Sequence, residues 1–170
     1  MKDGYIKVAA VTPQVTVADV KENTKEILKV IREAAVQKAK IIVLPELCIT
    51  GYTCQDLFLQ EILLREAKDA LLEISNQTKG IDALIFLGIP LEYHGNLYNT
   101  AAVLNQGKIL GFVPKRYIPN YNEFYEVRHF TKGMEEPVYV RLNQEITVPM
   151  GMNLLFCCEE VSELKVAAEI

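Results

Sequence analysis

The sequence predicts an α/β layered domain, because short apolar runs alternate with amphipathic helical segments in its first half and strand-like runs dominate its second half. The chain has 170 residues, of which 50% are hydrophobic and 24% are charged. This is the size and composition of one globular domain with a core of its own. No repeat, linker or low-complexity stretch divides the sequence, so we expect a single domain over residues 1–170.

The first half supplies strands and helices in turn. Residues 5–11 predict a buried strand, and residues 41–44, which Pro45 ends, predict a strand buried on both faces. Apolar side chains at helical spacing predict one helix over residues 19–38 and a second over residues 59–78. Residues 83–89 form the next apolar run and are expected to be a strand.

The second half contains strands around one irregular segment. Residues 100–104 and 109–113 flank an Asn-Gln-Gly-Lys turn and predict a hairpin. Residues 115–133 are polar, aromatic and aperiodic, which is typical of a functional loop. Further strands are expected at residues 138–140, 153–157 and 164–170. The last run stops without a polar tail, so we expect the chain to be cut before its domain is complete.

Composition excludes several classes of function. A net charge of −4 gives no support to nucleic-acid binding, and the longest apolar run is too short to span a membrane. The four cysteines have no CxxC spacing and follow no signal peptide, so we expect reduced thiols in a cytoplasmic protein. With only two histidines, a metal site is not expected, and a catalyst would depend on carboxylates, lysines and thiols.

Two strand ends carry candidate catalytic residues of opposite charge. Glu46 follows the predicted strand at residues 41–44, and Lys115 follows the one at residues 109–113, each directly after a proline. Open α/β sheets place their ligands at the carboxyl ends of strands, where a glutamate can act as a general base and a lysine can stabilise an oxyanion. Each residue alone is better explained as an exposed charge at a strand end, but the two together are more suggestive and predict a shared pocket.

Two other groups have alternative interpretations. The aromatic side chains of the irregular loop, with Tyr117, Tyr121 and Tyr125 among them, suit either a small-molecule pocket or a protein contact surface. Cys157 and Cys158 precede two glutamates and could supply a nucleophile. Cysteines that end an apolar run are more often simply buried, and we favour that interpretation.

Two long motifs resemble those of a known family. Residues 44–58 read LPELCITGYTCQDLF, and residues 114–128 read PKRYIPNYNEFYEVR. Together they resemble the nitrilase, or carbon–nitrogen hydrolase, superfamily, and within it the glutaminase domain of glutamine-dependent NAD synthetases. The resemblance covers essentially the whole chain. It implies an α-β-β-α sandwich truncated before its last strands and helices, so that residues 1–170 are one incomplete domain without the synthetase domain.

The resemblance also implies roles for individual residues. Glu46 matches the general base, Lys115 the lysine that stabilises the oxyanion, and Glu123 the second, supporting glutamate of the superfamily. Tyr52 and Tyr121 match aromatic positions that hold glutamine. The nucleophilic cysteine of the family would directly follow Ile170, so it is absent from this chain. We therefore expect the fragment to be inactive.

The family's reaction releases ammonia from L-glutamine for amidation of nicotinic acid adenine dinucleotide. The resemblance implies no cofactor in this part of the enzyme, because ATP and Mg serve the synthetase domain. Its implied partners are L-glutamine, the synthetase domain of the same chain and, in the full-length protein, further copies in a homo-oligomer. Two alternatives stay open at this point: a free-standing amidase or carbamoylase of the superfamily, and a non-catalytic assembly module.

Overall fold

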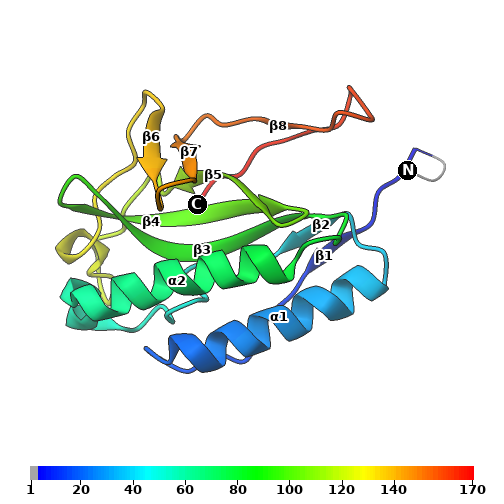
Figure 1. Ribbon diagram of the computed structural model, residues 1–170. Coiled ribbons are helices and arrows are strands. Elements are labelled where there is room, and N and C mark those ends of the chain that lie inside the picture. The colour runs from blue at the N-terminus through cyan, green and yellow to red at the C-terminus, as the bar shows by residue number, and fades with distance from the viewer. Residues whose placement is uncertain (1–3) are drawn as a thin grey trace.

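The computed structural model describes residues 4–170 as a layer of helices, a central sheet and a smaller strand layer (Figure 1). The central sheet contains β1 (Val8–Ala10), β2 (Ile41–Val43), β3 (Leu84–Tyr93), β4 (Asn96–Asn105), β5 (Lys108–Pro114), β6 (Val138–Arg141) and β7 (Thr147–Met150). Its spatial order is β1-β2-β3-β4-β5-β7-β6, while β8 (Phe156–Cys157) and β9 (Lys165–Val166) pair separately. The α/β class predicted from the sequence is confirmed.

Two amphipathic helices cover one face of the sheet (Figure 1). They are α1 (Val20–Val36) and α2 (Glu61–Gln77), close to the predicted bounds, and a short 3-10 helix, η1 (Gln55–Leu59), leads into α2. Asp19 caps α1, because its side chain accepts a hydrogen bond from the Glu22 amide at 3.0 Å. Ile27 and Ile31 are fully buried against the sheet, which fixes the helix on its apolar side.

Strands β3, β4 and β5 form an antiparallel meander, whereas β1, β2 and β3 run parallel. The predicted hairpin is confirmed as β4 and β5, which turn at Gln106 and Gly107 with positive φ angles of 48° and 82°. A longer hairpin joins β3 to β4, with the left-handed turn at His94 and Gly95. Both long strands of this hairpin are almost entirely buried.

The structure corrects the expected burial of the first two strands. Strand β1 is an edge strand with Val8 55% exposed, and in β2 Val43 is 40% exposed while Ile42 is buried. The reason is that the helices cover only one face here, and the other face of β2 lines a pocket. Strand β7 was not predicted, because Pro149 interrupts its apolar pattern.

Residues near the end of the chain cover the face of the sheet opposite the helices. Val166, Ala168 and Ile170 pack on a small apolar cluster that contains Phe86 and Val103. This segment is mostly irregular, because only Lys165 and Val166 of the predicted strand at residues 164–170 pair with β8. Within residues 4–170, no helix is both long and apolar enough to cross a membrane.

Candidate active site

A tight turn after β2 places Glu46. The Leu44 amide still bonds to Phe86 of β3 at 2.8 Å, and the turn then passes closely over Gly88 of the same strand. A Cβ atom at Gly88 would lie 2.0 Å from the Leu47 amide nitrogen, which is closer than any side chain can come. Gly88 is therefore required for the turn that holds Glu46 at the end of β2.

Lys115 follows β5, which β3 and β4 separate from β2, and its side chain reaches Glu46. Its amide donates to the Asn99 carbonyl of β4 at 2.8 Å, which extends the pairing of β4 and β5 by one residue. The side-chain ammonium, in a residue only 9% exposed, donates to Oε1 of Glu46 at 2.7 Å. The two charged residues that follow prolines in the sequence thus share one site, as expected for strand ends at one edge of a sheet.

A second carboxylate contacts Lys115, and it is Glu126 rather than Glu123. Oε1 of Glu126 accepts a hydrogen bond from the Lys115 ammonium at 3.0 Å, and Glu126 is buried. Glu123 is exposed and makes no hydrogen bond or ion pair with the described residues. Glu126 opens a short 3-10 helix, η2 (Glu126–Arg128), whose turn buries Phe130 four residues later, and this places Glu126 on the inner side.

Of the two tyrosines expected at the site, one joins this cluster. The Tyr52 hydroxyl donates to Oε1 of Glu126 at 2.6 Å, although the residue is 39% exposed. Partial burial, and then the hydrogen bond to Glu126, hold the pKa of Tyr52 well above its ordinary value. Tyr121 is exposed on the loop, where its ring packs edge-on against Phe124, and it makes no hydrogen bond to the cluster in the part of the chain described.

The Lys115 ammonium carries its charge in this environment because two carboxylates surround it. Burial works against the charged form, but the hydrogen bonds and charges of Glu46 and Glu126 outweigh it and raise the pKa of Lys115 above its ordinary value. Two carboxylates around one ammonium leave the cluster with one excess negative charge. Such a group can accept a proton and, at the lysine, stabilise a negative oxygen.

Asn99 is a further member of the cluster that the sequence analysis missed. It lies in the middle of β4, is fully buried and donates from Nδ2 to Oε1 of Glu46. Among the described residues, the two buried side-chain oxygens without a hydrogen-bond partner are Oδ1 of Asn99 and Oε2 of Glu126. Both belong to this cluster, which is typical of functional sites. The available signal was one asparagine inside the long apolar run at residues 97–104.

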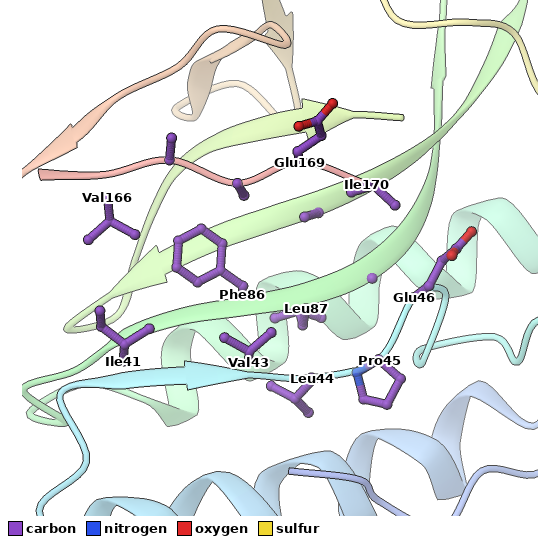
Figure 2. A pocket seen from close by; sticks show the side chains of 14 residues that line it. Ile41, Val43, Leu44, Pro45, Glu46, Phe86, Leu87, Val166, Glu169 and Ile170 are labelled. Carbon is purple, nitrogen blue, oxygen red and sulfur yellow. The ribbon is translucent and has the colours of Figure 1, made fainter. Parts of the chain in front are cut away.

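A pocket of about 390 Å³ lies beside Glu46. It is lined by β2, β3 and residues 166–170, and Figure 2 shows Glu46 at the edge of the lining side chains, with Phe86 among the apolar ones. The pocket is mostly apolar, and Glu46 is the charged side chain at its border with the charged cluster. Small molecules bind in sites of this size and character.

No cysteine of the chain contacts the charged cluster. Cys48 is buried within the turn after β2 and Cys54 is buried just before η1, and burial raises the pKa of the Cys48 thiol to about 12. Cys157 is exposed and Cys158 half-buried, which corrects the expectation that these two are buried. None of the four lines the pocket beside Glu46. Within residues 4–170, no group of three or more histidine, cysteine or carboxylate side chains is placed to hold a metal ion.

Comparison with known proteins identifies the family. Residues 7–162 match the model of the carbon–nitrogen hydrolase family. The chain belongs to this family. It is 35% identical over 167 residues to a glutamine-dependent NAD(+) synthetase of Mycobacterium tuberculosis strain H37Rv, covering 98% of this chain and 24% of that protein. The chain thus spans about a quarter of the length of the curated relatives that it matches first.

Solved structures confirm the nitrilase-like fold predicted from the sequence, of which this chain holds a part. A glutamine-dependent NAD(+) synthetase from Cytophaga hutchinsonii superposes with a TM-score of 0.84 and 31% identity, over 91% of this chain and 26% of that one. An amidase from a Nesterenkonia species superposes with a TM-score of 0.64 at 19% identity, over 83% of this chain and 53% of that one. The amidase shows only that the fold is shared.

Proposed function

We propose that this chain is the N-terminal part of the glutaminase domain of a glutamine-dependent NAD synthetase. The observation that carries the proposal is the buried Lys115 ammonium between the carboxylates of Glu46 and Glu126, at 2.7 and 3.0 Å. The likeness along 98% of the chain to a protein of that name supports the same function. An amide of L-glutamine is then the substrate of the site.

Glu46 acts as the general base in this proposal. It takes the proton of a cysteine thiol as the sulfur attacks the amide carbon of glutamine and forms a carbon–sulfur bond. The same proton passes to the amide nitrogen, the carbon–nitrogen bond breaks and ammonia leaves. Glu46 then takes a proton from water, which attacks the thioester and releases glutamate with the thiol restored. A histidine is not needed.

Lys115 stabilises the negative oxygen of the tetrahedral intermediates. Its ammonium is already held by two carboxylates, so it needs no reorganisation when the oxyanion forms. Glu126 serves as the second, supporting glutamate, because it contacts both Lys115 and Tyr52. Tyr52 lies at the cluster and Tyr121 on the exposed loop above it, and both are proposed to bind glutamine.

The nucleophilic thiol is proposed to come from sequence that follows Ile170 in a longer protein. None of the cysteines at positions 48, 54, 157 and 158 contacts the charged cluster, which supports this view. The 170 residues alone should then be unable to hydrolyse glutamine. In the longer protein, the ammonia would pass to a synthetase domain that uses ATP and Mg to amidate nicotinic acid adenine dinucleotide, within a homo-oligomer.

Ammonia release tests this function. The longer protein that contains residues 1–170 should release ammonia from L-glutamine, and Glu46→Gln should abolish the release. Asparagine and N-carbamoyl amino acids should be poor substrates. Preferred hydrolysis of a carbamoyl compound would instead support a free-standing carbamoylase. No release from any amide, with an unchanged oligomeric state, would support an assembly module.

A further inference from the structure

We propose that Asn99 is a positioning residue that selects which oxygen of Glu46 accepts the proton. With Lys115, it holds Oε1 of Glu46 and leaves Oε2 free to act as the base. This inference rests on the proposed function, because it assigns a further residue to the same reaction. It names a group that contacts neither substrate nor nucleophile but acts through Glu46.

The hydrogen bonds at Glu46 are strongly one-sided. Oε1 accepts from two donors, the Lys115 ammonium at 2.7 Å and Nδ2 of Asn99. Oε2 takes part in no hydrogen bond within residues 4–170, and the Glu46 side chain is 31% exposed beside the pocket. A carboxylate oxygen with two donors is a weaker proton acceptor than one with none. Oε2 is therefore the more basic oxygen of Glu46, and it is the one left free to accept a proton from a group in the pocket.

The backbone of Asn99 is held on both sides by neighbouring strands. The residue is fully buried in the middle of β4, paired with Pro90 of β3 on one side. On the other side its carbonyl accepts the Lys115 amide at 2.8 Å. Asn99 thus contacts both the backbone of Lys115 and the side chain of Glu46.

The orientation of the amide follows from charge. If the amide of Asn99 were turned over, its oxygen would face the carboxylate of Glu46, and two acceptors would repel. With Nδ2 toward Glu46, the carboxylate gains a charge-assisted hydrogen bond. A leucine at this position has a similar shape but offers no donor, so Glu46 could rotate between its two oxygens.

Nuclear magnetic resonance of the 170-residue chain tests the contact without any activity. The side-chain amide of Asn99 should be protected from exchange, and Glu46→Ala should move its resonances. Asn105 provides the matched control, since it lies on the same strand and its amide donates to the Ala83 carbonyl at 3.0 Å. Its resonances should not move. If the side-chain amide resonances of Asn99 did not shift in Glu46→Ala, the proposal would be overturned.

Kinetics of the longer, glutamine-hydrolysing protein test the role. Asn99→Leu should lower kcat roughly 10- to 100-fold, the size expected for one hydrogen bond to a charged group, with KM little changed. The acid limb of the rate–pH profile should move to higher pH, because the ionised form of Glu46 loses a donor. Lys115, Glu126 and Tyr52, which also face this site, are kept in every variant.

Two controls separate the outcomes. Asn105→Leu should change neither kcat nor the acid limb. If Asn99→Leu folds poorly, Asn99→Ser takes its place, because serine is too short to reach Glu46 and should cause the same changes in kcat and in the acid limb. A slower variant with an unmoved acid limb would show a merely structural role and contradict the proposal. If the wild-type protein releases no ammonia from glutamine, the proposed function fails, while the resonance test still decides the Asn99–Glu46 contact.

Discussion

Lys115 shows how a few residues determine the chemistry of this site. Its ammonium lies between Glu46 and Glu126. The pKa of the lysine is raised because the two carboxylates favour its charged form more than burial disfavours it. Removal of either partner would leave a buried charge poorly matched, which costs more free energy than an exposed pair contributes. We therefore expect the acidic residues that contact Lys115 to matter more for the reaction than an acidic residue that does not.

Glu126 and Glu123 make a matched pair for mutation. We expect Glu126→Gln to lower kcat/KM for glutamine by ~100-fold in the longer protein, because Lys115 loses one of its two carboxylates. Glu123→Gln should stay within about twofold, since Glu123 is exposed and away from the ion pairs described. Steady-state ammonia release measures both. A larger effect at Glu123 would contradict this expectation and favour Glu123 as the supporting glutamate, as the resemblance implies.

The hydrogen bond from Tyr52 to Glu126 should appear in the pH dependence of stability. The pKa of Tyr52 is raised above its ordinary value of 10.0, so the folded state holds the proton more tightly than the unfolded state. This stabilisation is fully present below pH 10 and is lost as the pH rises further. Tyr52→Phe should cost about 1 kcal/mol at pH 7, and the cost should shrink above pH 10.

Denaturant unfolding between neutral and alkaline pH measures this effect. Tyr139→Phe is the control, because the Tyr139 side chain is exposed on β6 and its replacement should give a small difference at every pH. A constant difference between wild type and Tyr52→Phe across the whole range would contradict the hydrogen bond as described.

Among the helices and strands, those with a regular spacing of apolar residues could be predicted from the sequence. Helices α1 and α2 and the β4–β5 hairpin were found because apolar spacing and turn residues act locally. Glu46 and Lys115 could be paired in advance because both follow strands that end in proline. That Glu126 rather than Glu123 contacts Lys115 could not be predicted, since an aperiodic loop gives no rule for which side chain turns inward. The contact of Asn99 with Glu46 could not be predicted either, because Asn99 lies inside a buried strand whose pattern shows only that it is buried.

The turn after β2 depends on one glycine of β3. Gly88→Ala would place a Cβ atom 2.0 Å from the Leu47 nitrogen and 2.6 Å from the Glu46 carbonyl carbon. We expect a loss of at least about 3 kcal/mol in the free energy of unfolding, because backbone must move to make room. Gly95→Ala meets no atom within 4 Å and should cost only its left-handed strain, about 1–2 kcal/mol.

Chemical denaturation compares these two glycine variants. Equal losses at the two positions would mean that the turn can shift away from β3 freely. Glu46 would then be held by its hydrogen bonds alone.

An ion-pair cluster joins the two loops that contain η1 and η2. Arg128 of η2 donates to Asp56 of η1 at 2.7 and 3.0 Å, and His129 lies 3.0 Å from the same carboxylate. The Arg128 hydrogen bond, with that of His129, lowers the pKa of Asp56 below its ordinary value of 3.8. The stability that the ionised Asp56 carboxylate contributes is therefore present above pH 3.8 and is lost as the pH falls below that value.

Hydrogen exchange tests the role of this cluster. Asp56→Asn should increase exchange of the His129 and Phe130 amides, which bond to the Glu126 carbonyl, at neutral pH. In the wild type the same amides should lose protection in acid. Asp82→Asn, which removes an exposed pair with Lys40 far from these loops in the sequence, should leave them unchanged. Unaltered exchange in Asp56→Asn would show that the loops hold together without the ion pairs.

For the whole molecule, the layers explain where a reaction can occur. The helices close one face of the sheet, and residues 166–170 cover part of the other, so the pocket beside Glu46 forms between the sheet and this segment (Figures 1 and 2). The charged cluster lies at the carboxyl ends of the parallel strands, on the same edge as the turn after β2. A thiol carried by sequence after Ile170 would enter at this place.

Covalent labelling with an electrophilic glutamine analogue tests the central claim most directly. Intact-mass spectrometry should find the 170-residue chain unmodified, because no thiol of this chain contacts Glu46 and Lys115. The longer protein should gain a single adduct, mapped just past Ile170 and lost on Glu46→Gln. Labelling of Cys157 or Cys158 with matching glutaminase activity would contradict the account, since the nucleophile would then be within these 170 residues.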